Sequence, residues 1–311
     1  MNILVAGGAG FIGSNLIDAL LKNGHDVVCI DNYFIGTKQN IAHLLNHPNF
    51  IMIEQDICNV ESLKKIFEQY AFDYVFHLAA NSDIQASANQ PMIECHNTYL
   101  TTFTLLECMR LYNVKRFFFA STSAVYGDKN GENVSENCPE LMPISYYGGA
   151  KLGSEAIISA YTYMNDMNTL IFRFPNVIGP RLTHGVIFDF IKRLRVEPDH
   201  LRILGDGRQS KPYIYVSDLV DAILHFMDSP KGITLYNVGV EGRTNVTHIA
   251  EIIIKKMGLS NVKLEYTGGT GGWKGDVPVF QYDLTKIHEA GWKANFTSDE
   301  SVEKTVEWAI R

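Results

Sequence analysis

The chain has 311 residues, of which 46% are hydrophobic and 20% charged, and its formal net charge is −7. This length allows a large core and two domains or lobes, and the composition is typical of a globular protein in water. The acidic balance and the lack of a basic block argue against nucleic acid or an anionic membrane surface as a partner. No apolar run reaches the ~18 residues of a membrane span.

The five cysteines show no Cys-x-x-Cys or Cys/His metal-site spacing, and the histidines show no His-Glu-x-x-His motif. We therefore expect no metal, and reduced, mostly buried thiols. The N-terminus begins directly with an apolar run and carries no basic leader segment. These features together lead us to expect a cytoplasmic enzyme.

The first 31 residues predict a strand, a phosphate-binding loop, a helix and a second strand. An apolar run at 3–6 precedes a turn with glycines at Gly7, Gly10 and Gly13, and an amphipathic segment follows to Lys22. Such glycines supply positive φ, a close approach to a pyrophosphate and close helix-on-strand packing. The first helical N–H groups, at Phe11 and Ile12, would face the phosphates. A tight turn without a ligand is the less favoured alternative, because strand, helix and a later acid frame the motif.

Asp31 ends the second strand about 20 residues after the loop, where a carboxylate can accept hydrogen bonds from an adenosine ribose. Its charge would repel a 2′-phosphate, so NAD is favoured over NADP, and Asn32 is expected beside it at the cofactor. Asp56 and Ile57 follow the strand predicted at 50–53. Asp56 either reaches the adenine amino group or caps the helix predicted at 60–70, and the two alternatives have equal weight.

The middle of the chain alternates short apolar strands with helical segments. Strands are predicted at 74–80, 116–121 and 169–174, and helices at 92–112 and 146–164. This alternation predicts a doubly wound parallel α/β sheet, whose ligands bind at the carboxyl ends of the strands.

A candidate catalytic group lies on this edge. Tyr147 and Lys151 are four residues apart at the start of a helix and so share one face. The Lys151 ammonium, together with an oxidised nicotinamide, would lower the tyrosine pKa from its usual value near ~10. The resulting phenolate could take a proton from an alcohol while a hydride leaves the same carbon. Thr122, at the end of a predicted strand, could hydrogen-bond the same substrate oxygen.

From Pro175 onward the pattern changes to a smaller lobe. Helices are predicted at 186–195, 217–227, 246–257 and 299–311, strands at 213–216 and 235–238, and an irregular stretch from Pro198. We expect a cofactor-binding domain at 1–175 and a second lobe at 176–311, with part of 212–240 packing back on the first domain.

These motifs resemble those of the extended short-chain dehydrogenases/reductases that act on nucleotide sugars. The resemblance spans nearly the whole chain and rests on Gly7-x-x-Gly10-x-x-Gly13, Asp31, Asp56-Ile57, His77-Leu78-Ala79-Ala80, Asn97, Ser121-Thr122-Ser123-x-Val125-Tyr126-Gly127, Tyr147-x-x-x-Lys151 and the segment from Arg173 to Arg181. It implies a Rossmann-like NAD domain, a smaller C-terminal α/β lobe that binds a nucleotide sugar, and a homodimer built from four helices.

The resemblance also implies roles for particular residues. Tyr147 would be the general base, and Lys151 would orient it and hold the nicotinamide ribose. Asn176 would contact the sugar diphosphate, and the segment from Val186 would cover the nucleotide. Further cofactor contacts are implied for Leu78, Ala79, Ala80, Asn97 and Phe174, and further substrate contacts for Thr122 and Ser123.

Two departures from the family pattern concern the substrate. Lys211 and the Trp273-Lys274 pair stand where many relatives carry arginines, and an ammonium does not grip a diphosphate in bidentate fashion. Arg181, Arg208 or Lys274 would compensate, or these three are solvated surface charges.

The residues directly after the catalytic threonine predict the reaction. Ser123 and Ala124 stand where relatives that dehydrate or decarboxylate the sugar commonly carry an acid. This favours a UDP-glucose 4-epimerase-like enzyme. The alternative is a C4 dehydrogenase of an NDP-hexose or NDP-heptose, such as a GDP-sugar, that releases the 4-keto product. A non-catalytic NAD-sensing protein ranks lowest, because Tyr147 and Lys151 are both present.

Overall fold

The computed structural model describes residues 1–84, 86–269 and 275–311. The chain divides into two compact units: residues 1–125, 145–173 and 223–236 form the first, and residues 126–144, 174–222 and 237–311 form the second. The expected boundary after residue 175 lies close to one of these crossings. The chain passes between the units at other places as well, so one boundary does not separate them. Residues 223–236 return to the first unit, and the loop 126–144 belongs to the second.

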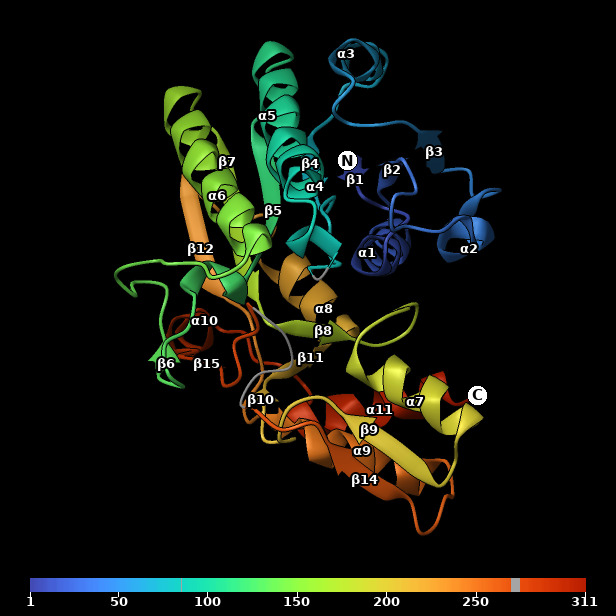
Figure 1. Cartoon of the computed structure of the whole chain (residues 1–311). Coiled ribbons are helices and arrows are strands. Elements are labelled where there is room, and N and C mark those ends of the chain that lie inside the picture. The colour runs from blue at the N-terminus through green and yellow to red at the C-terminus, as the bar shows by residue number, and fades with distance from the viewer. Residues whose placement is uncertain (85, 270–274) are drawn as a thin grey trace. The chain divides into compact units, whose positions relative to one another are not determined.

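A seven-stranded sheet forms the first unit (Figure 1). In chain order its strands are β1 (Asn2–Ala6), β2 (Asp26–Asp31), β3 (Phe50–Glu54), β4 (Tyr74–His77), β5 (Arg116–Thr122), β7 (Asn168–Phe174) and β12 (Ile233–Asn237). The spatial order is β12-β7-β5-β4-β1-β2-β3, and the pairs β1–β2, β2–β3, β1–β4 and β4–β5 are parallel. The predicted doubly wound, Rossmann-like fold is confirmed.

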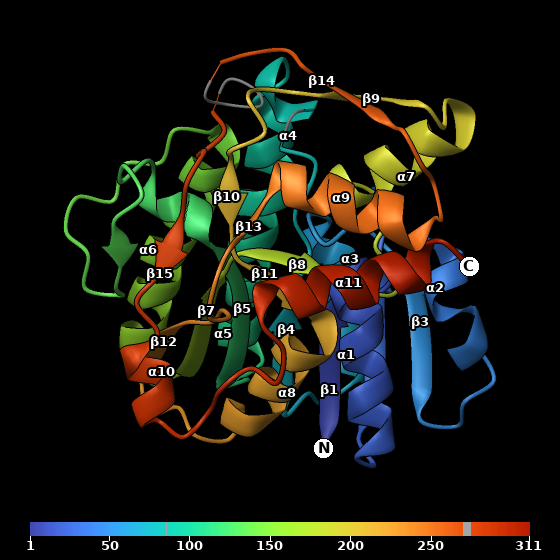
Figure 2. The same cartoon turned by 90° about the horizontal axis from the view of Figure 1, so that it is seen from below.

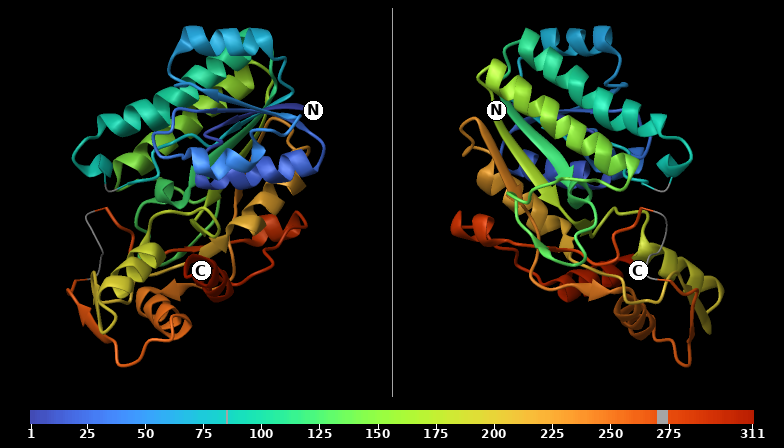
Figure 3. Two further views of the ribbon diagram at one scale, coloured as in Figure 1. Left: turned by 90° about the vertical axis from the view of Figure 1, so that its right-hand side faces the viewer. Right: turned by 60° about the vertical axis from the view of Figure 1, so that its left-hand side comes forward.

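Helices cover both faces of this sheet, with α3, α5 and α6 on one side and α1 on the other (Figure 3). Strand residues alternate between the two layers, as the period of two requires. Leu4 and Val28 join the core under α3 and α5, whereas the Ile17 side chain of α1 lies beside Cys29 on the opposite face. The helical elements of this unit are α1 (Phe11–Lys22), α2 (Lys38–Ile41), η1 (Ala42–Leu44), α3 (Val60–Gln69), η2 (Ala86–Ala88), α4 (Met92–Glu94), η3 (Cys95–Leu100), α5 (Thr101–Leu111), η4 (Ser123–Tyr126) and α6 (Tyr146–Met164).

The helix predicted at 92–112 is present but is not uniform. Its second segment, η3, is a π-helix of six residues inserted between α4 and α5. Such wide turns are frequently found at functional sites. Asn97, an expected cofactor contact, lies within this segment.

The strand order reverses between β1 and β4. Ala6 is paired with His77, and the N–H of Leu78 donates to the Ala6 carbonyl at 2.8 Å. The glycine loop after β1 and the Leu78–Ala80 segment after β4 therefore lie side by side. In open α/β sheets, the crevice outside such a reversal is where ligands bind.

The second unit has its own core, to which α7, α9 and α11 contribute (Figure 2). Its strands pair two by two: β8 (Asn176–Ile178) with β11 (Tyr213–Tyr215), β9 (His200–Ile203) with β14 (Lys263–Tyr266), β10 (Ser210–Lys211) with β13 (Thr244–Asn245), and β6 (Asn133–Val134) with β15 (Gln281–Tyr282). The helices are α7 (Val186–Val196), α9 (Val246–Lys256), α10 (Thr285–Glu289) and α11 (Ser298–Ala309), while α8 (Val216–Phe226) spans both units.

The irregular stretch expected from Pro198 contains strand β9, so that prediction is wrong. Leu201 and Ile203 are buried and alternate with half-buried or exposed neighbours. The polar–apolar alternation covers only four residues, which is the shortest length that indicates a strand. The parallel partner β14 lies about 60 residues further along the chain and supplies the missing hydrogen bonds.

All five cysteines are free thiols, but only Cys29 and Cys108 are buried, so the expectation of mostly buried thiols is wrong. Within the described ranges, no helix combines the length and apolarity that a bilayer crossing requires.

Candidate active site

The glycine loop fits a dinucleotide pyrophosphate. Gly7 adopts φ +81°, and a Cβ there would lie 2.5 Å from the Ala79 nitrogen, so only glycine allows β1 to end this close to the β4 side. A Cβ at Gly13 would lie 2.3 Å from the Gly7 carbonyl oxygen. Helix α1 begins without a capping side chain and has no acidic residue in its first turn. Its first N–H groups, including those of Phe11 and Ile12, are thus left for an anion.

Asp31 lies at the carboxyl end of β2 and is buried. Its two carboxylate oxygens accept hydrogen bonds from the N–H groups of Ala9, at 2.9 Å, and Tyr33, at 2.8 Å. Burial raises the pKa of Asp31, and these two hydrogen bonds act in the opposite direction. Each oxygen has a further lone pair for a ribose hydroxyl. The neighbouring Asn32 is exposed and accepts the Phe34 N–H at 3.0 Å.

The loop after β3 decides between the two roles considered for Asp56. Helix α3 is capped by Asn59, whose side chain accepts the Ser62 N–H at 3.1 Å, so the capping role of Asp56 is wrong. Asp56 instead accepts the Cys58 N–H at 2.8 Å, and Ile57 between them is buried. The adenine contact remains the prediction for Asp56. Burial, and then the Asp56 charge, raise the pKa of Cys58 to about 12.

The structure brings Thr122, Tyr147 and Lys151 together. Thr122 is the last residue of β5, and the side chains of Tyr147 and Thr122 are hydrogen-bonded. Tyr147 and Lys151 lie in the first turns of α6, which is capped by Ser145, whose hydroxyl accepts the Gly148 N–H at 3.1 Å. The Lys151 ammonium lies 5.9 Å from the Tyr147 ring centroid and donates to the Ala120 carbonyl at 2.7 Å.

The electrostatics of this trio differ from the sequence-based expectation. Burial, and then the Glu94 charge, raise the pKa of Tyr147, whereas its hydrogen bond with Thr122 acts to lower it. Burial lowers the pKa of Lys151 to about 7, against the opposing effect of Glu94 and Glu155. The pKa of Tyr147 is thus raised, so the expected lowering by Lys151 is wrong for the protein without cofactor. An oxidised nicotinamide would add a positive charge that favours the phenolate.

Sequence reasoning missed the buried carboxylate of Glu94. Its two oxygens accept hydrogen bonds from the Asn81 amide and the Thr98 hydroxyl, each at 2.7 Å. Asn81 directly follows the Leu78–Ala80 segment, and Thr98 follows Asn97 in η3. Glu94 thus connects the end of β4 to the π-helix beside α6. No short sequence motif indicates Glu94, because its partners Asn81 and Thr98 are 13 and 4 residues away.

A second buried carboxylate, Glu155, lies one helical turn after Lys151. Its oxygens accept two hydrogen bonds from the Arg173 guanidinium of β7, at 3.0 and 2.6 Å, and one from the Ser121 hydroxyl of β5. This bidentate ion pair fixes α6 against the two strands that flank the catalytic edge. The sequence indicates Glu155 through its spacing of four from Lys151, but it does not indicate that Arg173 is the partner of Glu155.

His77 is a core residue, as predicted. Its Nε2 lies 2.9 Å from the Thr102 hydroxyl, and that hydroxyl donates to the Thr98 carbonyl, so Nε2 carries the proton. Full burial and the nearby Lys151 hold the pKa of His77 well below its usual value. A neutral, buried imidazole of this kind supports packing around the site.

The remaining expected site residues divide between the units. Ser123 opens η4, and Leu78, Ala79, Ala80 and Asn97 are half-buried at the carboxyl edge of the first unit. Phe174, Asn176, Arg181, Val186 and Lys211 belong to the second unit, and Lys274 lies outside the described residues.

In the second unit, Asn176 and Tyr213 are paired across strands β8 and β11, and their side chains are hydrogen-bonded. Burial raises the pKa of Tyr213 to about 12. Lys211 forms an ion pair with Asp276, whose side chain is only 8% exposed. The cation that replaces the usual arginine is therefore held by a carboxylate of the same lobe.

The reversal point, the glycine loop and the hydroxyl–amine trio define a dinucleotide-dependent enzyme of the short-chain dehydrogenase/reductase class. Residues 3–239 match the NAD dependent epimerase/dehydratase family, and the chain belongs to that family. It is an NAD-dependent sugar-nucleotide epimerase or oxidoreductase.

Three relatives illustrate the range of the family. UDP-glucuronate 4-epimerase of Thermodesulfobacterium geofontis is 31% identical, and the alignment covers 98% of this chain and 95% of that protein. The structure of UDP-glucose 4-epimerase of Thermotoga maritima with UDP-glucose is 32% identical, with a TM-score of 0.89 over 99% and 98% of the two chains. The structure of dTDP-glucose 4,6-dehydratase of Bacillus anthracis with NAD is 26% identical, with a TM-score of 0.87 over 99% and 96%.

Proposed function

We propose that the protein is an NAD-dependent 4-epimerase of a UDP-sugar, similar to UDP-glucose 4-epimerase, that works through a transient 4-ketosugar. The observation that supports this most is the Thr122–Tyr147–Lys151 group at the carboxyl edge of the sheet, followed by Ser123 and Ala124 instead of an acid. A dehydratase would need a base or acid at those positions to remove water after oxidation.

The chain's own residues account for the proton movements of this reaction. Tyr147 would take the C4 hydroxyl proton, and Thr122 would hydrogen-bond the same oxygen and hold it in line. When bound at the glycine loop and Asp31, NAD would supply the acceptor and the donor for the C4 hydride. Tyr147 would then give the proton back, so that protons and electrons balance within one turnover. Lys151, buried and fixed by the Ala120 carbonyl, would orient Tyr147 and bind the nicotinamide ribose.

The second candidate is a C4 dehydrogenase that releases the ketosugar. The same three residues perform its first half-reaction. The observation that favours it is the Lys211–Asp276 pair, because a substrate held by one neutralised ammonium instead of an arginine is gripped less firmly.

One experiment separates the candidates. Purified protein is mixed with UDP-, GDP-, CDP- and dTDP-sugars without added cofactor, the absorbance of reduced nicotinamide is followed, and the sugar product is identified. A C4-inverted sugar with no lasting absorbance change establishes the epimerase. Accumulated NADH with a free 4-ketosugar establishes the dehydrogenase. No absorbance change and no product with any sugar would contradict both and leave the NAD-sensing alternative.

We further propose that the chain forms a homodimer and acts in the cytoplasm. Helices α5 and α6 pack together, and apolar or aromatic side chains on this pair are exposed, among them Phe103 and Leu111 on α5 and Tyr163 and Met164 near the end of α6. Exposed apolar side chains concentrated on two neighbouring helices suit a four-helix interface. Sedimentation velocity on the purified protein and on Phe103→Glu tests this, because a charge in the interface should shift the dimer to a monomer.

A further inference from the structure

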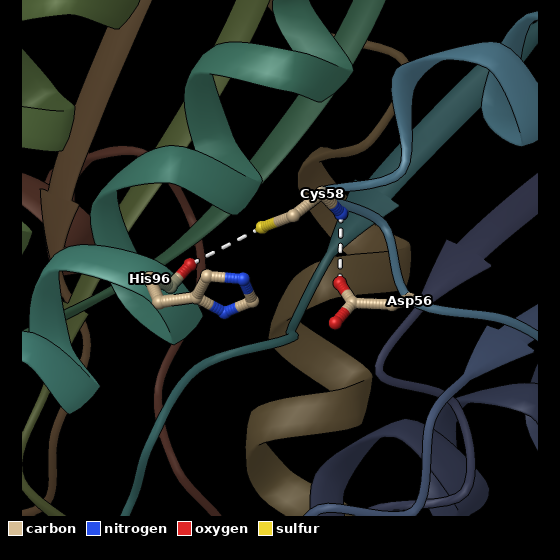
Figure 4. Close-up of side chains that lie close together, drawn as sticks. All are labelled: Asp56, Cys58 and His96. Carbon is tan, nitrogen blue, oxygen red and sulfur yellow. Dashed lines mark hydrogen bonds between the residues drawn. The ribbon is translucent and has the colours of Figure 1, made fainter.

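Three side chains that can bind metals converge at the carboxyl end of β3. Asp56 and Cys58 lie in the loop after this strand, and His96 lies in the π-helix η3, 38 residues beyond Cys58. A carboxylate oxygen of Asp56, the sulfur of Cys58 and a ring nitrogen of His96 all lie within 4.8 Å of one another. Figure 4 shows the thiol and the carboxylate on one side and the imidazole facing them.

Hydrogen bonds fix the three residues in this arrangement. The Cys58 N–H donates to one oxygen of Asp56 at 2.8 Å, which leaves the other oxygen for a further partner (Figure 4). The Cys58 thiol donates to the His96 carbonyl at 3.4 Å and so connects the loop to the helix. The Nδ1 atom of His96 lies 3.0 Å from the Asn97 side-chain oxygen. A hydrogen bond from one ring nitrogen to an oxygen is the usual device that orients a metal-binding histidine.

The donor set selects the kind of cation. Sulfur and imidazole nitrogen with one carboxylate suit Zn²⁺ and similar ions, whereas Ca²⁺ and Mg²⁺ require oxygen ligands. Zinc–ligand bonds of roughly 2.0–2.3 Å place neighbouring donors about 3.3–3.8 Å apart. Separations of at most 4.8 Å exceed this spacing by no more than about 1.0–1.5 Å, so the three side chains would have to draw slightly closer on binding.

We propose that Asp56, Cys58 and His96 form a binding site for a thiophilic divalent cation such as Zn²⁺, with the fourth position open to water. Binding releases the thiol proton to solvent, and the sulfur coordinates as a thiolate. No residue spacing in the sequence announces this site, because its ligands come from two segments that only the fold brings together.

Asp56 is also the residue expected to contact the adenine of NAD. The cation and the cofactor would then compete for one carboxylate. This consequence rests on the proposed cofactor site, whereas the metal site itself does not.

Cobalt(II) is the probe of choice, because a sulfur-to-cobalt charge-transfer band reports thiolate coordination directly. The tag-free full-length chain is treated with a chelator, desalted and titrated with Co²⁺. We expect the charge-transfer band together with the visible bands of a tetrahedral site, and Zn²⁺ should abolish both. Cys58→Ser should remove the charge-transfer band, and His96→Gln, at an exposed position, should weaken Co²⁺ binding at least tenfold.

Two other thiols provide matched controls. Cys95 precedes His96 in η3 and is exposed, and Cys138 lies in the second unit. Cys95→Ser and Cys138→Ser should keep the band. The absence of a charge-transfer band in the parent chain would overturn the proposal, as would a band that persists in Cys58→Ser. Thermal unfolding of each variant with chelator present shows that a lost band is not lost folding.

The competition is measured separately. NAD binding is first recorded by calorimetry with chelator present, and the Co²⁺ titration is then repeated at saturating NAD. We expect the apparent Co²⁺ affinity to fall at least tenfold. If NAD binds but leaves Co²⁺ affinity unchanged, the shared carboxylate is wrong. If NAD does not bind in chelator, the proposed function is contradicted, while the cobalt titration still decides the metal site.

Discussion

The two units hold their candidate site residues in different ways. In the first, Lys151, Glu94, Glu155 and Arg173 are buried, and each carries at least one hydrogen bond to a neighbouring element. In the second, Asn176 and Lys211 lie on strands of two or three residues, and Lys211 is balanced by a single carboxylate. The unit expected to carry out hydride transfer is therefore fixed by a buried polar network. The unit expected to bind the sugar nucleotide presents short strands and loops that tolerate change.

This difference bears on how the family varies its reactions. A buried network in which each member satisfies the next tolerates few substitutions, since removing one partner leaves another unpaired. Short edge strands and loops have no such restriction. Variation in the sugar is thus expected in the second unit, with the chemistry of the first unit kept.

Tyr147→Phe is expected to give the largest effect. It deletes only the hydroxyl that would move the proton, so hydride transfer should fall about 10²–10⁴-fold. The midpoint of thermal unfolding should change little. Single-turnover absorbance of reduced nicotinamide measures the transfer, and Tyr146→Phe, at an exposed neighbouring position, is the control. Full activity in Tyr147→Phe would contradict the mechanism.

Arg173→Met tests the network of the first unit. It leaves the buried Glu155 carboxylate without its bidentate partner, and such a loss costs about 3–5 kcal/mol of unfolding free energy. Lys38→Met removes an exposed ion pair with Glu54 and should change stability very little. Denaturant titration compares the two variants. Equal stabilities would show that the Glu155–Arg173 pair does not anchor α6.

Asp31→Ala tests the cofactor site, and it also leaves the Ala9 and Tyr33 N–H groups without their acceptor. The loss of a buried charged acceptor is expected to weaken NAD binding by about 1.5–3 kcal/mol, or roughly 10–150-fold, and to relax discrimination against NADP. Asp26→Ala, at the exposed start of the same strand, should leave both properties unchanged. Calorimetric titration with each cofactor gives the result, and an unaltered NAD/NADP ratio would remove Asp31 from the site.

Lys211→Arg and Lys211→Met test whether Lys211, in the second unit, binds the diphosphate of the substrate. If Lys211 faces the diphosphate, arginine should lower the KM for the nucleotide sugar several-fold and methionine should raise it, because a guanidinium binds phosphate through two hydrogen bonds. NAD affinity should stay the same in both variants. A KM that does not respond would place diphosphate binding on other residues, with Arg208 the next to test.

A pH series on the cofactor-free protein probes Lys151 directly. Its pKa is lowered to about 7 from an unfolded value of 10.5, so between these values the unfolded chain binds more protons than the folded one. The folded state is therefore penalised below pH 7, and this penalty disappears as the pH rises. The unfolding free energy relative to Lys151→Met should increase by up to about 1.4 kcal/mol per pH unit in this window. A flat difference would show that Lys151 titrates normally.

The sequence was most informative where a requirement is local. The requirements within the first βαβ unit are of this kind. Gly7 allows a turn with positive φ, Gly13 allows a close backbone approach, and Asp31 ends a strand, and the structure shows all three. The Tyr147–Lys151 pair could be predicted because a spacing of four residues places both side chains on one face of a helix. The sequence did not indicate Glu94, and it showed Arg173 only as part of a family motif, because the contacts of both residues come from other elements.

Other misses have similar causes. Strand β9 alternates over only four residues, and its pairing depends on the distant strand β14. The π-helix at Cys95–Leu100 has a sequence that a regular helix would accept equally well. The Asp56–Cys58–His96 group has no linear spacing, because a loop and a distant helix form it together.

The return of β12 to the edge of the first sheet has a consequence for how the chain is made. The first unit is complete only when residues 223–236 have been synthesised. Until then β7 is an open edge, and Phe172 lacks its ring contacts with Phe226 and Tyr236. A nascent chain that ends near residue 175 should therefore expose an unpaired apolar strand and depend on chaperones, and a fragment cut there should aggregate. Folding of the cofactor-binding unit is thereby tied to the translation of the lobe that follows it.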